Sequence, residues 1–175
     1  MGTRSYIAKQ IGDNQYLTIY CQLDGYPEYN GVILAKYYGT SKQIDALLAL
    51  GDLYCLGEKL TPDSGCHDFG TPQPGVTLAY QRDGGYFGGD ATIKTFEELI
   101  DWEQDGVQYI YIYDKNGQWL YSPTGNPEAV FRPLKDALEN DTVKYCEPPV
   151  LEDLLGEDWG DKQEHGESFK LEPKY

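Results

Sequence analysis

Three adjacent residues, Cys66, His67 and Asp68, have the side-chain types of a thiol nucleophile, a general base and an orienting carboxylate. A catalytic triad is a spatial arrangement drawn from distant segments, and neighbours in sequence do not normally present a thiol and an imidazole to each other. The other histidine of the chain is His165, so a serine–histidine catalytic pair would also have only two histidines to draw on. These residues therefore do not predict a hydrolase, and the sequence assigns no catalytic residue.

The four cysteines of the chain, Cys21, Cys55, Cys66 and Cys146, are irregularly spaced. A structural zinc site takes four nitrogen or sulfur ligands, often in closely spaced pairs such as Cys-x-x-Cys, and the chain has no such pair. We expect reduced thiols, with a disulfide or a zinc site that uses Cys55, Cys66 and His67 as the alternatives. The sequence predicts no metal and no other cofactor.

The tetrapeptide Asp24-Gly25-Tyr26-Pro27 follows a strand-like run and precedes a helical one. Functional carboxylates often stand at such strand ends, where Asp24 is suited to bind a cation or to orient a ligand hydroxyl. The competing interpretation is a turn, in which Gly25 supplies an unusual φ and Pro27 fixes its own φ. In the ligand-binding interpretation, the site consists of Arg4, Asp24, Tyr26 and Arg82.

A second candidate loop, residues 83–90 (DGGYFGGD), is rich in glycine. It lacks the lysine-containing phosphate cradle of P-loop proteins and does not open a helix after a strand, so it is predicted to be a flexible loop. Carboxylates are abundant enough to form chance pairs. A metal-dependent phosphodiesterase, however, normally adds a histidine cluster or an Asp-x-Asp cluster, and neither is evident in the chain.

Acidity is the most distinctive property of the composition. The 175 residues include 29 acidic and 14 basic side chains, which gives a formal charge of −15. Nucleic-acid phosphates repel such a protein, so a direct DNA- or RNA-binding function is disfavoured. The segment after Thr95 concentrates this charge. The residues predicted to form an interaction surface are Glu97, Glu98, Asp101, Trp102, Glu103 and Asp105.

Two interpretations of this acidic segment remain open. In the first, the carboxylates form a solvated face that aids solubility. In the second, rows of carboxylates occupy a basic groove of a nucleic-acid-binding protein, with the spacing of phosphates and with electrostatically steered association. Trp102 and exposed tyrosines then act as anchors.

Hydrophobic periodicity predicts the elements that position these residues. Two pairs of alternating runs flank turn sequences and predict two β-hairpins, at 4–11 with 15–23 and at 107–113 with 117–122. A further strand is predicted at 76–82. Helices are predicted at about 30–38, from Thr40 to Gly51, at about 96–104 and from Pro127 onward. This mixture predicts an α+β fold with a mainly antiparallel sheet built from hairpins and three to four helices packed on it.

Three helix starts have recognisable signals. Thr40 with Gln43, and Thr95 with Glu98, have the spacing of a capping box. Asn126 is expected to cap a helix that begins at Pro127. The predicted inner side of this last helix comprises Val130, Phe131, Leu134 and Leu138.

The chain divides into a predicted single domain, residues 1–145, and an acidic tail, residues 146–175, with a short amphipathic helix around Leu151. The 16 tyrosines against 5 phenylalanines suit strands that are wet on one face. No apolar run approaches the roughly 18–20 residues that span a bilayer, and no basic-then-apolar leader opens the chain. We therefore expect no membrane partner.

Three stretches together resemble a known family: MGTRSYIAKQ at the start, IYCQLDGYPEYNGVIL at 19–34 and LLALGDLYCLGEKL at 47–60. This is a family of small, functionally uncharacterised proteins of phages, prophages and other bacterial mobile elements. The resemblance covers about the first 60 residues and implies a setting, the cytoplasm of a bacterial host, rather than a mechanism. Relatives commonly carry His-Trp where this chain has Gln22-Leu23.

Three functions remain as hypotheses. The leading one is a non-enzymatic accessory protein that binds a host protein with a basic surface, in the manner of a nucleic-acid mimic that disables a defence factor. The second is a small-ligand (nucleotide-like) binding protein or enzyme with its site at the Asp24–Tyr26 loop. The third is a structural protein whose tail joins subunits into a homo-oligomer.

Overall fold

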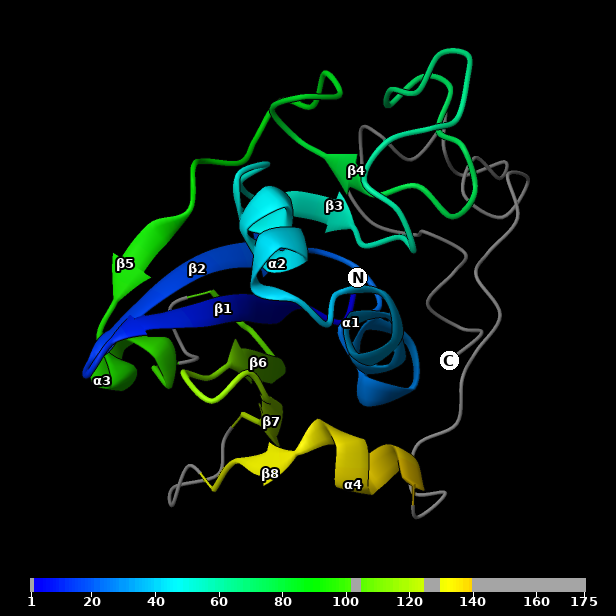
Figure 1. Ribbon diagram of the computed structural model, residues 1–175. Coiled ribbons are helices and arrows are strands. Elements are labelled where there is room, and N and C mark those ends of the chain that lie inside the picture. Colours follow the sequence, from blue (N-terminus) through cyan, green and yellow to red (C-terminus); the bar gives the residue numbers. More distant parts are fainter. Residues whose placement is uncertain (1, 102–104, 125–129, 140–175) are drawn as a thin grey trace.

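One twisted sheet organises the computed structural model, which describes residues 2–101, 105–124 and 130–139 (Figure 1). The described part of the chain has eight strands: β1 (Ser5–Gly12), β2 (Gln15–Cys21), β3 (Leu53–Cys55), β4 (Leu78–Ala79), β5 (Thr92–Lys94), β6 (Tyr109–Tyr113), β7 (Trp119–Pro123) and β8 (Arg132–Pro133). They follow the order β4-β3-β2-β1-β6-β7-β8, and β5 pairs with β2 off this path.

The sheet is mixed but mainly antiparallel. The two predicted hairpins are present as β1–β2 and β6–β7, and β2–β5, β3–β4 and β7–β8 are antiparallel as well. Parallel pairing joins β1 to β6 and β2 to β3. The predicted α+β fold is therefore confirmed. The parallel β1–β6 pair joins segments about a hundred residues apart, so no local turn signal in the sequence indicates it.

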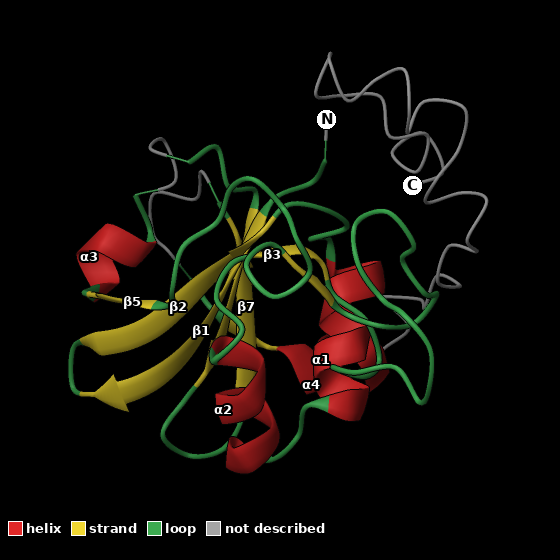
Figure 2. Cartoon of the chain, turned by 90° about the horizontal axis from the view of Figure 1, so that it is seen from above, coloured by secondary structure: helices red, strands yellow, loops and turns green. Residues whose placement is uncertain are grey.

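One face of the sheet carries most of the helices (Figure 2). These are the π-helix η1 (Pro27–Gly31) with α1 (Val32–Tyr37) directly after it, α2 (Ser41–Leu48) and α4 (Leu134–Glu139). Alternation in β1 and β2 sends Ile7 and Ile19 to this face, where they join the larger core cluster with Ile33, Leu47 and Tyr111. Burial of these apolar side chains is the main force that holds the helices on the sheet.

The opposite face holds a smaller cluster under α3 (Phe96–Leu99). Tyr6 and Ala8 of β1 meet Leu99, Val107 and Ile110 there. Both predicted capping boxes are confirmed. Thr95 Oγ1 accepts a hydrogen bond from the Glu98 backbone N–H while the Glu98 carboxylate accepts one from the Thr95 N–H, and Thr40 and Gln43 do the same at α2.

Three expected elements are wrong in extent, and two of them are a strand and a helix near the ends of the sheet order. The strand predicted at 76–82 forms β strand only at Leu78–Ala79, because the chain turns into the Gly-rich loop immediately afterwards. The helix predicted from Pro127 is not helical at Val130 and Phe131, and it begins at Leu134. Residues Arg132–Pro133 instead pair with β7, since this edge strand offers unpaired backbone groups.

Some expectations fall outside the described residues. They concern Trp102 and Glu103, the cap at Asn126, Cys146 and the tail 146–175. Within the described ranges, α3 ends at Leu99, short of the expected 104, and no helix is long and apolar enough to cross a membrane.

Candidate binding site

The acidic segment begins on α3, where each carboxylate has a different environment. Glu98 is the third helical residue of the capping box at Thr95, and hydrogen bonds from Thr95 hold the pKa of its carboxyl below the usual value. Glu97 is exposed and accepts a hydrogen bond from Asn14 Nδ2 at 3.2 Å. Asp101 is also exposed. Glu98 is therefore structural, whereas Glu97 and Asp101 present charge to solvent.

Asp105 connects this segment to the sheet. Its carboxylate accepts a hydrogen bond from the Tyr6 hydroxyl. The pKa of Tyr6 is raised above its usual range, chiefly by burial and secondly by this hydrogen bond. Lys94 Nζ lies 5.3 Å from the centre of the Tyr6 ring and stands close enough to Glu98 to lower the pKa of its carboxyl. One lysine thus lies among the acids, and the segment remains acidic in sum.

A cavity of about 330 Å³ lies beside Asp105. Elements far apart in sequence form its walls: β2, the residue before β3, the residue after β4, the Gly-rich loop and the turn that precedes β6. Its lining residues are Tyr20, Gln22, Asp52, Tyr80, Phe87, Gly88 and Asp105. The volume is at the lower end of the usual range for small-ligand pockets.

Asp52 fixes two of these walls to each other. Its Oδ1 accepts a hydrogen bond from the Tyr20 backbone N–H and its Oδ2 accepts one from the Gly89 N–H, both at 2.9 Å. The Asp52 N–H donates in return to the Gly89 carbonyl at 2.9 Å. The Gly-rich loop, predicted to be flexible, is therefore held at Gly89.

The two phenols of the cavity stay protonated well into the alkaline range. Burial raises the pKa of Tyr20 from 10.0 to about 12, although Arg4 beside it acts in the opposite direction. Burial also raises the pKa of Tyr80, with smaller contributions from Tyr20 and Asp52. Tyr20 donates its hydroxyl hydrogen to Gln22 Oε1 at 2.6 Å. The charged groups of the lining are therefore the Asp52 and Asp105 carboxylates.

The outer wall of the cavity is the loop at Phe87 and Gly88. Gly88 has φ of 98°, and a Cβ there would lie 2.6 Å from Cβ of Tyr80, so a glycine is required at this close approach. Phe87 lines the cavity and still exposes 77% of its surface, while its neighbour Tyr86 exposes 97%. The cavity is therefore lined on this side by a residue that is largely exposed to solvent.

The Asp24 loop lies elsewhere and is closed. Asp24 is buried, and the Tyr26 hydroxyl donates to its Oδ1 at 3.2 Å. The expectation that Gly25 supplies the unusual φ is wrong, because Asp24 has φ of 57°. Gly25 is needed for a different reason: a Cβ there would lie 2.8 Å from the Thr3 carbonyl oxygen. Nearby Asn30, fully buried on η1, keeps an unpartnered Oδ1.

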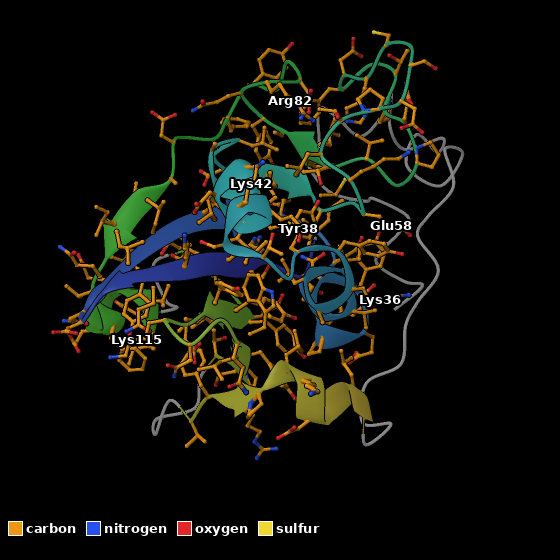
Figure 3. The ribbon with its side chains drawn as sticks, viewed as in Figure 1. Lys36, Tyr38, Lys42, Glu58, Arg82 and Lys115 are labelled. Atoms are coloured by element: carbon orange, nitrogen blue, oxygen red, sulfur yellow. The ribbon has the colours of Figure 1, made fainter. Side chains whose placement is uncertain are left out.

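The two arginines of the predicted ligand site point to other partners. Arg82 donates to both oxygens of Asp83, to the Thr77 carbonyl and to the Leu60 carbonyl. Figure 3 shows Arg82 in the loop-rich part of the molecule, away from the end of the sheet that carries α3. Arg4 interacts with Tyr20, and neither Asp24 nor Arg82 lines the described cavity. Arg82 is therefore held by Asp83 and by two backbone carbonyls, and Arg4 lies beside Tyr20.

The Cys66-His67-Asp68 segment has a structural role. His67 Nδ1 accepts a hydrogen bond from the Gln73 backbone N–H at 3.0 Å, so Nε2 carries the proton and donates to the Thr77 carbonyl at 2.9 Å. Asp68 closes a turn through the N–H groups of Gly70 and Thr71. Both imidazole nitrogens are occupied, which leaves His67 no free nitrogen to act as a base.

The described cysteines, Cys21, Cys55 and Cys66, are free thiols. Burial raises the pKa of Cys21 from 9.0 to about 12 and raises that of Cys55 further. Thiols held in the protonated form are poor nucleophiles and poor metal ligands. Within residues 2–101, 105–124 and 130–139, no group of three or more His, Cys, Asp or Glu side chains is placed to hold a metal ion.

Comparison of the chain with models of known protein families, with curated proteins and with solved structures found no match. The site is therefore interpreted from its own chemistry. Of the residues predicted from sequence, Asp105 lines the cavity and Arg4 adjoins it. Asp52, Tyr20 and Tyr80 were missed. The sequence held a signal for Tyr20 only: Tyr16, Thr18, Tyr20 and Gln22 share the polar face of the predicted strand 15–23, a pattern that predicts a wet sheet face and not a cavity wall.

Proposed function

We propose that this chain is a non-enzymatic accessory protein of a phage or mobile element that binds a host protein through a basic surface of that partner. The observation that carries the proposal is the set of exposed carboxylates Glu97, Asp101 and Asp105, of which Asp105 also lines an aromatic-lined cavity. Carboxylates on a rigid edge attract a basic partner and set its orientation. A non-enzymatic role fits the occupied His67 and the protonated buried thiols.

Charge reversal tests this proposal. The double variant Glu97→Lys/Asp101→Lys is expected to bind a partner captured from bacterial lysate about tenfold more weakly at ~50 mM salt, because steering charges act over roughly a Debye length. The wild-type affinity is expected to fall as salt rises to ~500 mM, and the variant is expected to show a flatter salt dependence. Calorimetry or surface plasmon resonance on the purified pair measures both.

The matched control reverses two exposed acids elsewhere, Asp63 and Asp136, which changes the net charge by the same amount. If this control weakens binding as much as the α3 variant does, bulk charge rather than a defined surface attracts the partner. A wild-type affinity that does not change between the two salt concentrations contradicts the electrostatic basis of the proposal.

A small-ligand function is the second candidate, and the cavity rather than the Asp24 loop is the observation that favours it. Asp24 is buried and has φ of 57°, a conformation that aspartate tolerates in turns, which suits a structural role. The nucleotide-like ligand of the sequence-based hypothesis fits the cavity poorly, since two carboxylates repel phosphate. The assembly hypothesis concerns residues 146–175 and stays a prediction.

A further inference from the structure

The cavity combines two kinds of group that a single ligand chemistry satisfies together. Tyr20, Tyr80 and Phe87 contribute aromatic rings, and Asp52 and Asp105 contribute negative charge. Aromatic faces and carboxylates both attract organic cations, the rings through their quadrupole and the carboxylates through charge-assisted hydrogen bonds. Anions and neutral apolar ligands would leave at least one of these two sets unsatisfied.

The charge balance around the cavity favours a cation. Asp52 accepts hydrogen bonds from two backbone N–H groups, which are neutral donors and leave its negative charge uncompensated. Asp105 accepts from the neutral Tyr6 hydroxyl. Arg4 acts on Tyr20 and Lys94 Nζ lies 5.3 Å from the centre of the Tyr6 ring, but the described lining of the cavity contains neither cation and contains both carboxylates. A carboxylate has about four hydrogen-bond acceptor positions, so Asp52 and Asp105 can each accept further hydrogen bonds.

The shape of the groups favours a guanidinium over an ammonium. A guanidinium is planar, stacks on aromatic rings and donates to carboxylates with a fork of N–H groups, whereas an ammonium is a compact and strongly hydrated point charge. The exposed Phe87 ring at the mouth is positioned to cover the aliphatic stem of an entering side chain. Burial of this ring would then add to the affinity.

We propose that the cavity between Asp52 and Asp105 is the anchor pocket for one arginine side chain of the basic partner. The inference rests on the proposed function and adds to it the residue type that the partner contributes. Tyr20 and Tyr80 form the walls, Phe87 closes over the stem, and the two carboxylates receive the guanidinium N–H groups.

The test is an NMR titration of the full-length ¹⁵N-labelled chain with the capped peptide acetyl-Gly-Arg-Gly-amide. Saturable shifts are expected at the amides of Tyr20, Gly88 and Gly89, with a dissociation constant in the millimolar range. The same peptide with citrulline in place of arginine has the shape without the charge. It is expected to bind about tenfold more weakly or not at all, since a charge-assisted bond is roughly twice as strong as a neutral one.

Variants then locate the binding. Asp105→Asn and Phe87→Ala are each expected to weaken binding of the arginine peptide about fivefold, as estimated from the carboxylate and cation–π contributions. Asp63→Asn, an exposed carboxylate outside the cavity, is the matched control and should leave binding unchanged. Asp52 is not used because it holds two backbone N–H groups, and thermal unfolding confirms that each variant folds.

Three results would overturn the proposal: equal binding of the arginine and citrulline peptides, unchanged binding in Asp105→Asn and Phe87→Ala, or tenfold tighter binding of propylguanidine than of the peptide. The last result would assign the cavity to a free guanidine compound. The titration needs no partner protein, so it can fail while the charge-reversal experiment succeeds, and the reverse also holds.

Discussion

Replacing Asp83 by alanine is expected to lower the free energy of unfolding by about 3–5 kcal/mol, the cost of removing one member of a buried ion pair. Asp83 exposes 4% of its side chain and accepts hydrogen bonds from the Ala79 N–H at 2.7 Å and from Arg82 Nε at 2.8 Å. The substitution leaves the Ala79 N–H without its acceptor and Arg82 without its counter-ion. Urea unfolding at pH 7 measures the loss.

Two comparisons make this result interpretable. Asp63→Ala removes an exposed carboxylate paired with Lys59 at 2.7 Å and is expected to change stability by less than about 1 kcal/mol. Arg82→Ala combined with Asp83→Ala gives the coupling energy of the pair in a double-mutant cycle. A loss in Asp83→Ala no larger than in Asp63→Ala would show that the Arg82–Asp83 pair does not fix the loop after β4.

Raising the pH above 9 is expected to unfold the protein cooperatively before pH 12. The pKa of Cys21 is raised from 9.0 to about 12, and those of Tyr20 and Tyr38 from 10.0 to about 12, in each case chiefly by burial. The unfolded chain therefore releases these protons first, and stability falls as pH rises from 9 towards 12. The pKa difference of Cys21 alone corresponds to about 4 kcal/mol by pH 12, against a typical total stability of about 5–15 kcal/mol.

The measurement follows tyrosinate absorbance and far-ultraviolet circular dichroism together. The tyrosinate signal of buried phenols such as Tyr111 is expected to appear together with the loss of circular dichroism, because these phenols ionise only when the fold opens, whereas exposed phenols contribute a separate phase. In Cys21→Ala, stability is expected to fall less steeply between pH 9 and 12 than in the wild type. Titration of all 16 tyrosines near pH 10 with intact circular dichroism would contradict the assigned burial.

The Asp83 substitution and the alkaline transition are expected to affect the cavity as well as the stability of the fold. Asp83 fixes the start of the Gly-rich loop, and Asp52 fixes its far end at Gly89. Phe87 and Gly88 lie between these two points and close the cavity. Loss of the Arg82–Asp83 pair should therefore weaken arginine-peptide binding in addition to lowering stability, and Tyr20 couples the cavity to the same alkaline transition.

The sequence by itself determined the local features. Both hairpins, the two capping boxes and the alternation of β2 follow from interactions within a few residues, so pattern was sufficient to predict them. The acidity of the chain also follows directly from its composition. The helix expected from Pro127 failed at Val130 and Phe131, because pairing of β8 with the edge of β7 outweighed local helix signals.

Only the tertiary structure decided where the site lies. Asp52, Tyr80 and Asp105 are separated by about 25 residues each along the chain, and they meet because β3, the end of β4 and the turn before β6 reach the same side of the sheet. The same folding placed the Arg82 guanidinium against the Leu60 and Thr77 carbonyls and buried Asp24. Long-range strand pairing depends on how the whole hydrophobic core closes, and no short window of sequence contains that information.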